Sequence, residues 1–519
     1  MCRRLVLGLT MLLAACSNGG SSSNNVPNVP VLPWGSFRHD GANSALGASI
    51  GSNGGNVAVI AFAPDPMTGV VPIPTSTAAV DLNGNIFLGT TQGLFSFDRN
   101  GGFRWQFRKC FCPINIPCPY PNGIPIGPIR SSPNVTPGST IVFGSDPVPG
   151  STDPFDAGAV FAIQDIKQGA PRGSVPGCYW GFRPPDHTHE YRVRSSPSTL
   201  VNALDLSLQS VFFADSDGVL RALNPDGTIR WEIQASNAEI TSSPALDFSG
   251  NIYITTPDGV LTVATVNGIP TWTASVGVPP TTTQPPDPDR DLLTSPLIGT
   301  NAYLVGEGGD LLARVPSGQE RWVYVPTNAI VGSPTLILLT FGVQAFTAVD
   351  VVVTAVDADT NVYAIRDSTG EPMSVQQCSG GTQQNCTMDS CAPTGGTCIS
   401  NRCTDASGTL GCRTDSCLPN NGTCTVIPTF GTQPIALGQT VSTSPVMSAD
   451  AFVVFGTDDG LVCARAVNGD VPGAWNAILD LPGCVDLDSK KDEPAISSPA
   501  IGPNGQIYVS TKSGLYIIQ

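Results

Sequence analysis

The stretch "SSPALDFSGNIYITTPDGVLTVATVNGIPTW", residues 242–272, contains three short apolar runs separated by polar turns that include glycine. The runs at 251–256 and 260–266 are rich in β-branched and aromatic residues, which favour extended strands. Between and after them, Pro-Asp-Gly and Asn-Gly supply turns that tolerate a positive φ. The stretch therefore predicts a β-meander. Because a lone meander of this length cannot bury its hydrophobic faces, we expect several copies that pack on one another.

Copies of this stretch recur along the chain. Most begin with a Ser-Ser-Pro-like anchor, continue with a strand such as "GNIFLGT" at 84–90, and end with Gly-x-x-x-Trp or a looser version of it. Eight anchors begin at Ser76, Ser131, Ser195, Ser242, Thr294, Gly332, Thr443 and Ser497. The tryptophans that close six of the units are Trp105, Trp180, Trp231, Trp272, Trp322 and Trp475.

Each unit reads as four antiparallel strands, with the tryptophan on the outermost strand and packed toward the neighbouring unit. Sheets of this kind arranged radially form a β-propeller. The last unit ends after its third strand, and the apolar run "NVAVIAFAP" at 56–64 is predicted to supply the fourth. The predicted fold is all-β: an eight-bladed β-propeller of four-stranded antiparallel blades, closed by an N-terminal strand and carrying a small Cys-rich disulfide insert.

The repeat resembles that of pyrroloquinoline-quinone-type propellers in its Ser-Ser-Pro, Gly-Asn-Ile-Tyr, Asp-Gly and Gly-x-x-x-Trp elements. The segment "WGSFRHDGANSALG" at 34–47 is similar to the one that opens many of these propellers. The resemblance implies a propeller over residues 34–519. Its members include quinoprotein dehydrogenases and the lipoprotein subunit of the outer-membrane β-barrel assembly machinery, so the fold alone does not choose between enzyme and scaffold.

The N-terminus predicts a lipoprotein. Residues 1–15 carry two arginines, a short apolar segment and small residues, as a signal peptide does, and the segment is shorter than the roughly 20 residues of a spanning helix. "LAAC" matches a bacterial lipobox, which makes Cys16 the lipidation site. Residues 16–33 then form a flexible, lipidated tether. By resemblance to lipoproteins with Ser after the lipidated cysteine, we expect the outer membrane of a Gram-negative bacterium.

The charge balance restricts the partners. The chain has 41 acidic and 25 basic residues, which gives a net charge of -16. Nucleic acid and anionic lipid headgroups are therefore poor partners. We expect a monomeric ring that contacts the membrane only through its N-terminal lipid.

Cysteine usage indicates an oxidising compartment. Of 16 cysteines, Cys2 leaves with the signal peptide and Cys16 takes the lipid, so an even number remains. One group is expected to brace the first two blades, and eight others form an insert at 378–424 in which Cys-x4-Cys-x6-Cys occurs twice. Zinc is the alternative for the insert, although it lacks histidine and a Cys-x2-Cys knuckle. The candidate disulfide cysteines are Cys110, Cys112, Cys118, Cys178, Cys378, Cys386, Cys391, Cys398, Cys403, Cys412, Cys417 and Cys424.

Long connections are predicted to gather on one face of the ring. In a four-stranded blade, the connection to the next blade and the connection between the second and third strands lie on the same face. Function on such scaffolds usually sits on variable loops, so this face is the expected binding surface. The long connections assigned to it are 109–130, 146–158, 181–194, 278–293, 378–440 and 478–496.

The segment "DHTHE" at 186–190 is the candidate metal site. Alternate residues of an extended chain share a side, so His187 and His189 could bind one ion, although the sequence identifies no third ligand. The alternative is a polar loop that leads into the third blade. The Asp-rich turns elsewhere lack the later oxygen ligands of a calcium loop, and hairpin turns explain them.

Family knowledge implies that calcium-dependent quinoprotein dehydrogenases need a disulfide of adjacent cysteines and a tryptophan floor beneath the cofactor. This chain has no Cys-Cys dipeptide, and its tryptophans are assigned to outer strands. We therefore expect no pyrroloquinoline quinone or other cofactor and no catalytic residues. The sequence favours a lipid-anchored scaffold for an envelope protein, peptide or glycan; the alternatives are a periplasmic quinoprotein dehydrogenase and a metal-binding envelope protein.

Overall fold

The structure is a computed structural model, and every element in its described residues is a strand. None of the described segments forms a helix that is long and apolar enough to cross a membrane. The structure describes residues 57–64, 69–111, 123–151, 158–166, 176–184, 191–202, 204–247, 249–257, 260–275, 295–299, 301–305, 309–326, 329–341, 348–357, 362–367, 370, 374–379, 397–399, 402–405, 408–411, 423–428, 440–448, 452–466, 483–487 and 493–519.

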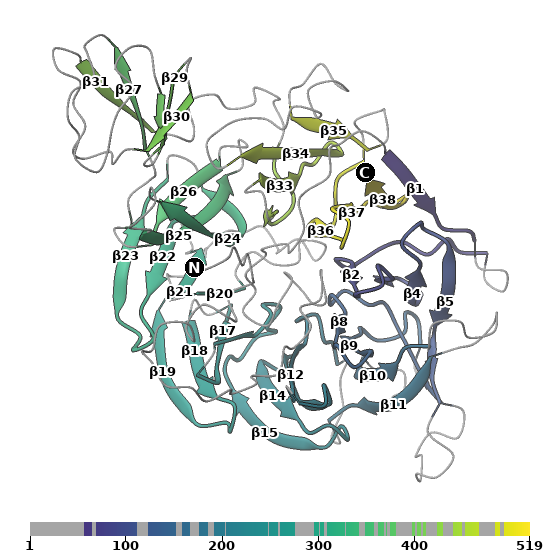
Figure 1. The fold of residues 1–519 in the computed structure, drawn as a ribbon. Helices are drawn as coiled ribbons and strands as arrows, with labels where there is room; N and C mark the ends of the chain where they lie inside the picture. The colour runs from purple at the N-terminus through teal and green to yellow at the C-terminus, as the bar shows by residue number, and fades with distance from the viewer. Residues whose placement is uncertain are drawn as a thin grey trace, which may run out of the picture.

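Eight antiparallel sheets are arranged radially as the blades of a closed ring (Figure 1), which confirms the predicted propeller. The first four blades are β2 (Ala79–Val80), β3 (Ile86–Thr90), β4 (Gly93–Phe97) and β5 (Phe103–Phe107); β8 (Asn134–Val135), β9 (Thr140–Gly144), β10 (Val160–Gln164) and β11 (Gly177–Phe182); β12 (Ser198–Val201), β13 (Leu208–Ala214), β14 (Val219–Leu223) and β15 (Ile229–Gln234); and β16 (Ala245–Leu246), β17 (Asn251–Thr255), β18 (Val260–Thr265) and β19 (Pro270–Ser275).

The second half of the ring continues the pattern with one exception, in blade 6. The strands are β20 (Leu297–Ile298), β21 (Ala302–Val305), β22 (Leu311–Arg314) and β23 (Glu320–Tyr324); β24 (Ile330–Phe341), β25 (Ala348–Asp357) and β26 (Val362–Arg366); β32 (Val446–Met447), β33 (Phe452–Gly456), β34 (Leu461–Ala466) and β35 (Cys484–Asp486); and β36 (Ala500–Ile501), β37 (Ile507–Ser510) and β38 (Gly514–Ile518) with β1 (Val57–Ala61). A small ribbon of β6 (Lys109–Cys110) and β7 (Ile124–Pro125) lies between blades 1 and 2.

The N-terminal strand closes the ring as the sequence predicted. β1 pairs antiparallel with β38, from Val57 opposite Ile518 to Ala61 opposite Gly514. Ile60 packs against the core shared by blades 7, 8 and 1. A strand from one end of the chain thus completes the blade formed at the other end.

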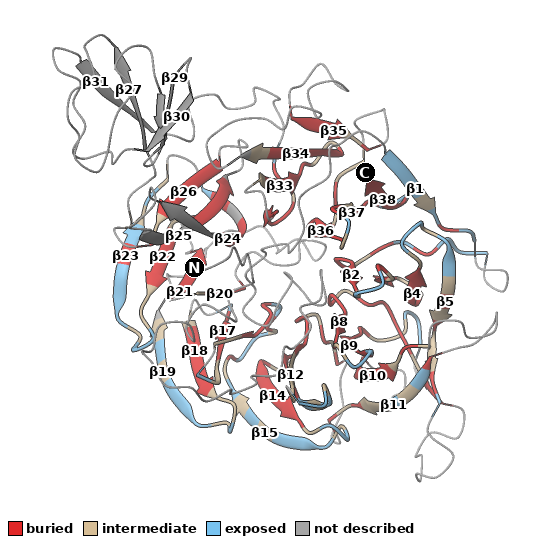
Figure 2. Cartoon of the chain, viewed as in Figure 1, coloured by how far each residue is buried: buried red, intermediate tan, exposed pale blue. Residues whose placement is uncertain are grey.

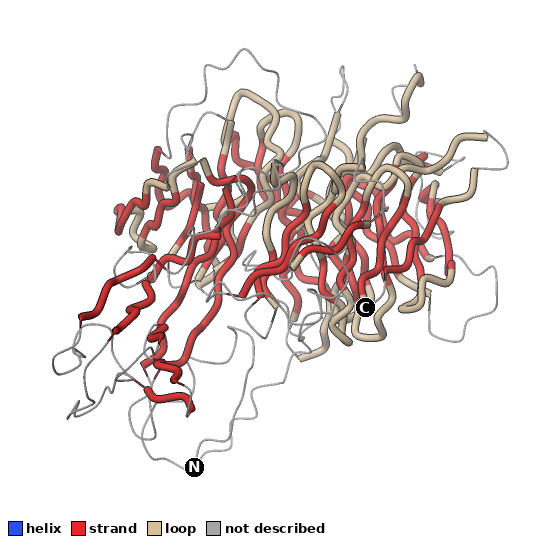
Figure 3. The backbone as a smooth tube through the Cα atoms, turned by 90° about the horizontal axis from the view of Figure 1, so that it is seen from above, coloured by secondary structure: helices blue, strands red, loops and turns tan. Residues whose placement is uncertain are grey.

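The ring has two faces, which the edge-on view in Figure 3 separates. One face carries the connections between blades and those between second and third strands, and we call it the loop face. The opposite one, which carries the connections between first and second strands and between third and fourth strands, is the turn face. Figure 2 shows that the third strands are buried, while the outer strands carry exposed residues. For example, all of β14 is buried, whereas β15 alternates between exposed and half-buried residues.

The Ser-Ser-Pro anchors hold the inner ends of the blades together through two sets of hydrogen bonds. The first serine acts within its blade: the Ser131 hydroxyl accepts from the backbone N–H of Gly144 at 2.7 Å. The second serine links neighbouring blades, because its backbone N–H donates to the hydroxyl of the equivalent serine in the next blade. This link is formed from Ser132 to Ser196, from Ser196 to Ser243, from Ser243 to Ser295 and from Ser333 to Ser444, at 2.9 to 3.0 Å.

The outer tryptophans hold neighbouring blades together at the rim. The Trp231 indole N–H donates to the carbonyl oxygen of Val266 in the next blade at 2.9 Å, and the ring covers Gly268 there. A Cβ at Gly268 would lie 2.5 Å from Trp231, which explains why each unit needs glycine before its own tryptophan. The same contact joins Trp180 to Gly227, Trp272 to Gly318 and Trp322 to Gly370.

Blade 6 departs from the predicted four strands. Within the described residues its sheet contains β24, β25 and β26, and the next strand, β27 (Ser374–Ser379), pairs with β31 (Thr423–Pro428) instead. One reason lies in the sequence: four residues after Gly370 the chain has Ser374 where other units have tryptophan, so the outer position lacks its rim contact. The connection at 378–440, which we assigned to the loop face, therefore follows a third strand that ends at the turn face.

The Cys-rich insert forms its own sheet, which Figure 1 shows outside the ring. Its order is β30 (Gly408–Gly411), β29 (Arg402–Asp405), β28 (Thr397–Ile399), β27 and β31. The strand register places Cys378 opposite Cys424 and Cys398 opposite Cys403. Cys386, Cys391, Cys412 and Cys417 lie outside the described residues.

Candidate functional site

Two disulfides brace the described part of the ring. Cys110 on β6 is bonded to Cys178 on β11, which fastens the connection after blade 1 to the outer strand of blade 2. Cys112, Cys118, His187 and His189 lie outside the described residues, as do Cys16 and His39. In the part of the chain that is described, no three His, Cys, Asp or Glu side chains are grouped as a metal site requires.

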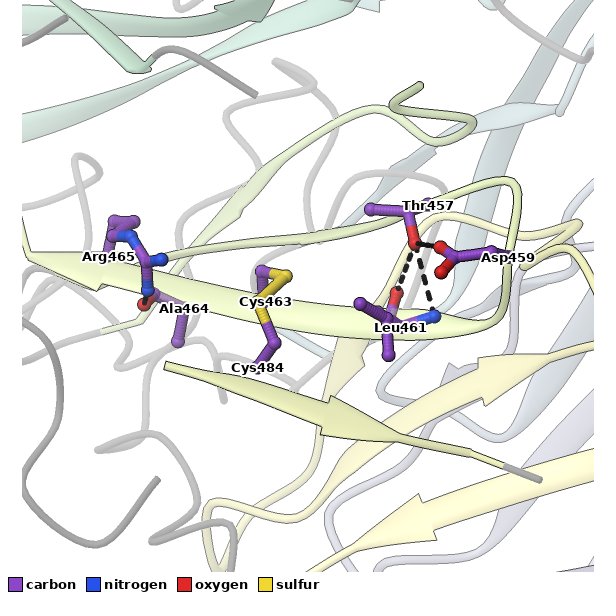
Figure 4. Close-up of a disulfide and its surroundings, with 7 residues drawn as sticks. All are labelled: Thr457, Asp459, Leu461, Cys463, Ala464, Arg465 and Cys484. Atoms are coloured by element: carbon purple, nitrogen blue, oxygen red, sulfur yellow. Dashed lines mark hydrogen bonds between the residues drawn. A yellow bond between two sulfur atoms is a disulfide. The ribbon is translucent and has the colours of Figure 1, made fainter. Parts of the chain in front are cut away.

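The second disulfide, Cys463 to Cys484, was missed by the sequence analysis. The two residues lie directly opposite each other on β34 and β35, and both are buried (Figure 4). This bond places the outer strand of blade 7 at 484–486, whereas the sequence predicts that this unit ends at Trp475. The cysteine count could have identified this pair. Once Cys2, Cys16 and the twelve cysteines of the two predicted groups are set aside, only Cys463 and Cys484 remain.

A row of charged side chains crosses the loop face over blades 2 and 3. Arg130 and Arg194 each occupy the position immediately before a Ser-Ser-Pro anchor, so the anchors place them side by side near the ring axis. Asp146, at the end of the second strand of blade 2, binds both: its Oδ2 lies 3.1 Å from Arg130 Nε and 3.0 Å from Arg194 Nη2.

The row continues toward blade 4. Glu239, in the connection between blades 3 and 4, lies 3.7 Å from Arg194 Nε through its Oε1. Its Oε2 accepts from Arg192 Nη2 at 2.9 Å. We call the five residues Arg130, Asp146, Arg192, Arg194 and Glu239 the charged belt. The belt has three guanidinium groups and two carboxylates, so it sums to one positive charge in a chain with a net charge of -16.

A buried hydrogen-bond network begins at Tyr191, the residue before Arg192 of the belt. The Tyr191 hydroxyl donates to Asp215 Oδ2 at 3.0 Å, and Arg221 Nε donates to the same oxygen at 2.6 Å. Arg221 also forms an ion pair with Glu232. Burial raises the pKa of the Asp215 carboxyl, and the charge of Arg221 opposes this rise. Burial also raises the pKa of Tyr191 well above its ordinary value, so its hydroxyl remains a donor at neutral pH.

An apolar strip adjoins the belt on the same face. Val70, Val71 and Ile73 are exposed in the connection between β1 and blade 1, and we call them the apolar strip. Ile73 exchanges backbone and side-chain hydrogen bonds with Thr91 at the tip of blade 1. Two residues further on, the Thr75 hydroxyl donates to the carbonyl of Ile129, next to Arg130, at 2.6 Å. This hydrogen bond joins the segment that carries the strip to the residue before Arg130 of the belt.

The exposed guanidinium groups of the belt suit the recognition of carboxylates on another molecule. A guanidinium presents a planar set of donors that fits carboxylates, and partly exposed Arg next to apolar residues is typical of the energetically important part of a protein interface. Solvent reaches Arg130, Arg192 and Arg194, whereas Asp146 is buried. The belt and strip together are the candidate site. Both lie on the face that the sequence predicted to bind a partner, but the sequence analysis did not name their residues.

Comparison with known proteins gives the class of fold. Residues 190–376, about a third of the chain, match the family model described as outer membrane protein assembly factor BamB. With its eight radial blades, the chain is thus a β-propeller that is similar to that assembly factor over this part of its length, in agreement with the resemblance seen in its sequence. No curated protein matches the chain.

The similar solved structures include three at low identity. BamB from Moraxella catarrhalis is 13% identical, over 89% of this chain and 97% of its own, with a TM-score of 0.48. A europium-containing methanol dehydrogenase is 13% identical, over 92% and 89%, with a TM-score of 0.40. Sqt1 from Saccharomyces cerevisiae is 13% identical, over 64% and 80%, with a TM-score of 0.36.

Proposed function

We propose that this protein is a lipid-anchored scaffold of a Gram-negative cell envelope, which binds a protein partner through the charged belt and apolar strip of its loop face. The observation that carries the proposal is the belt: three arginines at two adjacent anchors are held by the buried Asp146 and the half-buried Glu239, beside exposed aliphatic residues. The match of residues 190–376 to an outer-membrane assembly factor supports a role in assembly. A partner segment with carboxylates and apolar side chains fits this surface.

Affinity capture from crosslinked envelopes tests the binding role. Replacing Arg130 and Arg192 by Gln removes two belt charges but keeps hydrogen-bonding side chains, so the fold is retained. We expect at least a tenfold loss of the proteins captured by the parent, since each arginine at such a site contributes about 1–2 kcal/mol. The matched control is Arg230→Gln, which changes an exposed arginine at the start of β15, near the turn face. Equal capture by both variants would refute the assigned site.

Lipid anchoring is tested separately. Because only the Cys16 thiol can take the predicted lipid, Cys16→Ala should release the protein from outer membranes or leave its precursor uncleaved. Fractionation of envelopes, with the size of the product read on a gel, measures both outcomes. A Cys2→Ala variant is the control and should be processed and anchored as the parent is. Normal cleavage and sedimentation of Cys16→Ala would contradict the anchor.

A further inference from the structure

Asp215 is fully buried directly after the second strand of blade 3, and its carboxylate accepts four hydrogen bonds. Its Oδ1 accepts from the backbone N–H groups of Asp217 and Val219, at 3.0 and 3.2 Å, and these two bonds shape the turn between β13 and β14. Its Oδ2 accepts from the Tyr191 hydroxyl at 3.0 Å and from Arg221 Nε at 2.6 Å. The second pair of bonds therefore ties the turn to the connection from blade 2 and to β14.

This second pair of bonds is not part of the repeat. Asp215 lies three residues before the glycine of its turn, and the same position holds a buried threonine in blades 4, 7 and 8: Thr256, Thr457 and Thr511. In blade 7 the Thr457 hydroxyl accepts from the backbone N–H of Leu461 at 3.1 Å, as Asp215 does from Val219. A hydroxyl is therefore sufficient for the turn, and a blade folds without a carboxylate at this position.

Arg221 is a second departure from the repeat in the same blade. It lies three residues after the turn glycine, where blade 4 has Thr262, and its side chain is only 6% exposed. Besides Asp215, it binds Glu232 on the outer strand of the blade. Removing such charges from water is costly, and well-packed uncharged residues in their place are often at least as stable. The stability of the blade thus does not account for this ion pair. We call Tyr191, Asp215 and Arg221 the blade 3 network.

The blade 3 network reaches Arg192 of the charged belt at two points. The residue before it, Tyr191, is fully buried and donates its hydroxyl to Asp215. Ser216, the residue after Asp215, joins the backbone of Arg192 twice. Its hydroxyl accepts from the Arg192 N–H at 3.1 Å, and its own N–H donates to the Arg192 carbonyl oxygen at 3.0 Å. The backbone of Arg192 is therefore fixed, while its side chain remains 31% exposed to a partner.

The same turn also holds Glu239, with which Arg192 forms an ion pair. The Asp215 carbonyl oxygen accepts from the backbone N–H of Ile240, directly after Glu239, at 3.1 Å. The Arg192 side chain then donates to Glu239 Oε2 from Nε and Nη2, at 3.1 and 2.9 Å. The backbone bond recurs at the threonine of blade 7, so it does not depend on the carboxylate. The carboxylate adds the bond to Tyr191, which fixes the chain where it leads into Arg192.

We propose that Asp215 and Arg221 are positioning residues of the partner site, which hold Arg192 of the belt in the orientation that receives a partner. This inference rests on the proposed binding role of the belt. Both residues are buried, so they act through Tyr191 and not by contact with the partner. An arginine whose backbone and neighbour are already fixed loses less conformational freedom on binding, so more of its interaction with a partner carboxylate appears as affinity. Arg221 contributes by pairing the carboxylate, since an unpaired buried charge is strongly destabilising.

Hydrogen exchange and partner capture test the proposal. The network variant Tyr191→Phe, Asp215→Thr, Arg221→Thr removes the buried polar set as a whole, so that none of its members is left unpaired. It should melt close to the parent, because blade 4 has threonine at two of these positions. We expect the backbone amides of residues 191–194 to exchange at least about threefold faster, because the bond that holds Tyr191 is lost. Capture from crosslinked envelopes should fall about fivefold, as expected for residues that act through others.

Tyr191→Phe alone is the second variant. It removes only the hydroxyl that reaches Asp215, so it should fold like the parent and show both effects at smaller size. The matched control is Tyr253→Phe, which removes a 3.0 Å bond from another buried tyrosine hydroxyl to Asp247 in the next blade, at the turn face. This control should leave both the exchange at 191–194 and the capture unchanged.

A double-mutant comparison separates positioning from general damage. If the blade 3 network acts through Arg192, the network variant combined with Arg192→Gln should capture as much as Arg192→Gln alone. Losses that multiply would show that the network affects capture by another route, and they would overturn the proposal. Unchanged exchange at 191–194 in the network variant would overturn it as well. The belt is refuted separately, if Arg192→Gln leaves capture unchanged, because the exchange measurement needs no partner.

Discussion

Replacing Ile60 by Asp is expected to lower the free energy of unfolding by about 3–4 kcal/mol, because the change puts a charge into the contact that closes the ring. Ile60 packs against the core of blades 7, 8 and 1, and a Cβ on Gly101 would lie only 3.0 Å from its Cδ1. In blades 2 to 5 an outer tryptophan occupies this place over the glycine of the next unit. Ile60 therefore stands in for that tryptophan at the point where the two ends of the chain meet.

Chemical denaturation of the mature chain measures this effect, and Val59→Asp is its control. Val59 lies on the same strand but is 52% exposed, so the same substitution should cost less than about 1 kcal/mol there. Limited proteolysis should also show faster cleavage near β1 in Ile60→Asp only. Similar denaturation midpoints for the two variants would mean that β1 does not close the ring through this side chain.

The second large effect is expected from Gly268→Ala, which should cost about 2–4 kcal/mol. Two penalties add: Gly268 has a φ of +79°, which a residue with a Cβ rarely adopts, and that Cβ would lie 2.5 Å from the Trp231 ring. Relief requires Trp231 to move away from blade 4. Such a movement lengthens the 2.9 Å hydrogen bond from its indole N–H to Val266.

Gly250→Ala separates the two penalties. Gly250 has a φ of +80° in the same blade, but a Cβ there would meet only Val266, at an ordinary 3.5 Å. This variant should therefore lose only the backbone part, about 1 kcal/mol. Thermal unfolding of both variants, together with tryptophan fluorescence, gives the difference. If Gly250→Ala were as destabilising as Gly268→Ala, the tryptophan contact would contribute nothing to the adhesion of the blades.

The structure explains why the repeat could be read from the sequence. In four pairs of blades, the second serine of an anchor uses its backbone N–H to join the equivalent serine hydroxyl of the next blade. In four pairs, a glycine makes room for the tryptophan of the blade before. Because these requirements recur along the chain, they leave a periodic signal. The closing strand was predictable for the same reason, because the last unit visibly lacked a fourth strand.

The departures have physical causes that do not repeat along the chain. The fourth strand of blade 6 pairs within the Cys-rich insert, where Ser374 replaces tryptophan and the register sets Cys378 opposite Cys424. In blade 7, the bond between Cys463 and Cys484 places the outer strand after Trp475. In both blades, pairing between distant residues overrides the spacing of the repeat.

By itself, the sequence determined the number of blades, the strand order of most of them and the closure of the ring, because hydrophobic alternation, turn chemistry and the anchors are local properties of each repeat. Only the tertiary structure decided the candidate site. Arg130, Arg194 and Glu239 lie in three separate connections, and they meet because the anchors place equivalent positions of adjacent blades side by side. A charged belt of this kind has no period and no motif, since it depends on which side chains ring closure brings within hydrogen-bonding distance.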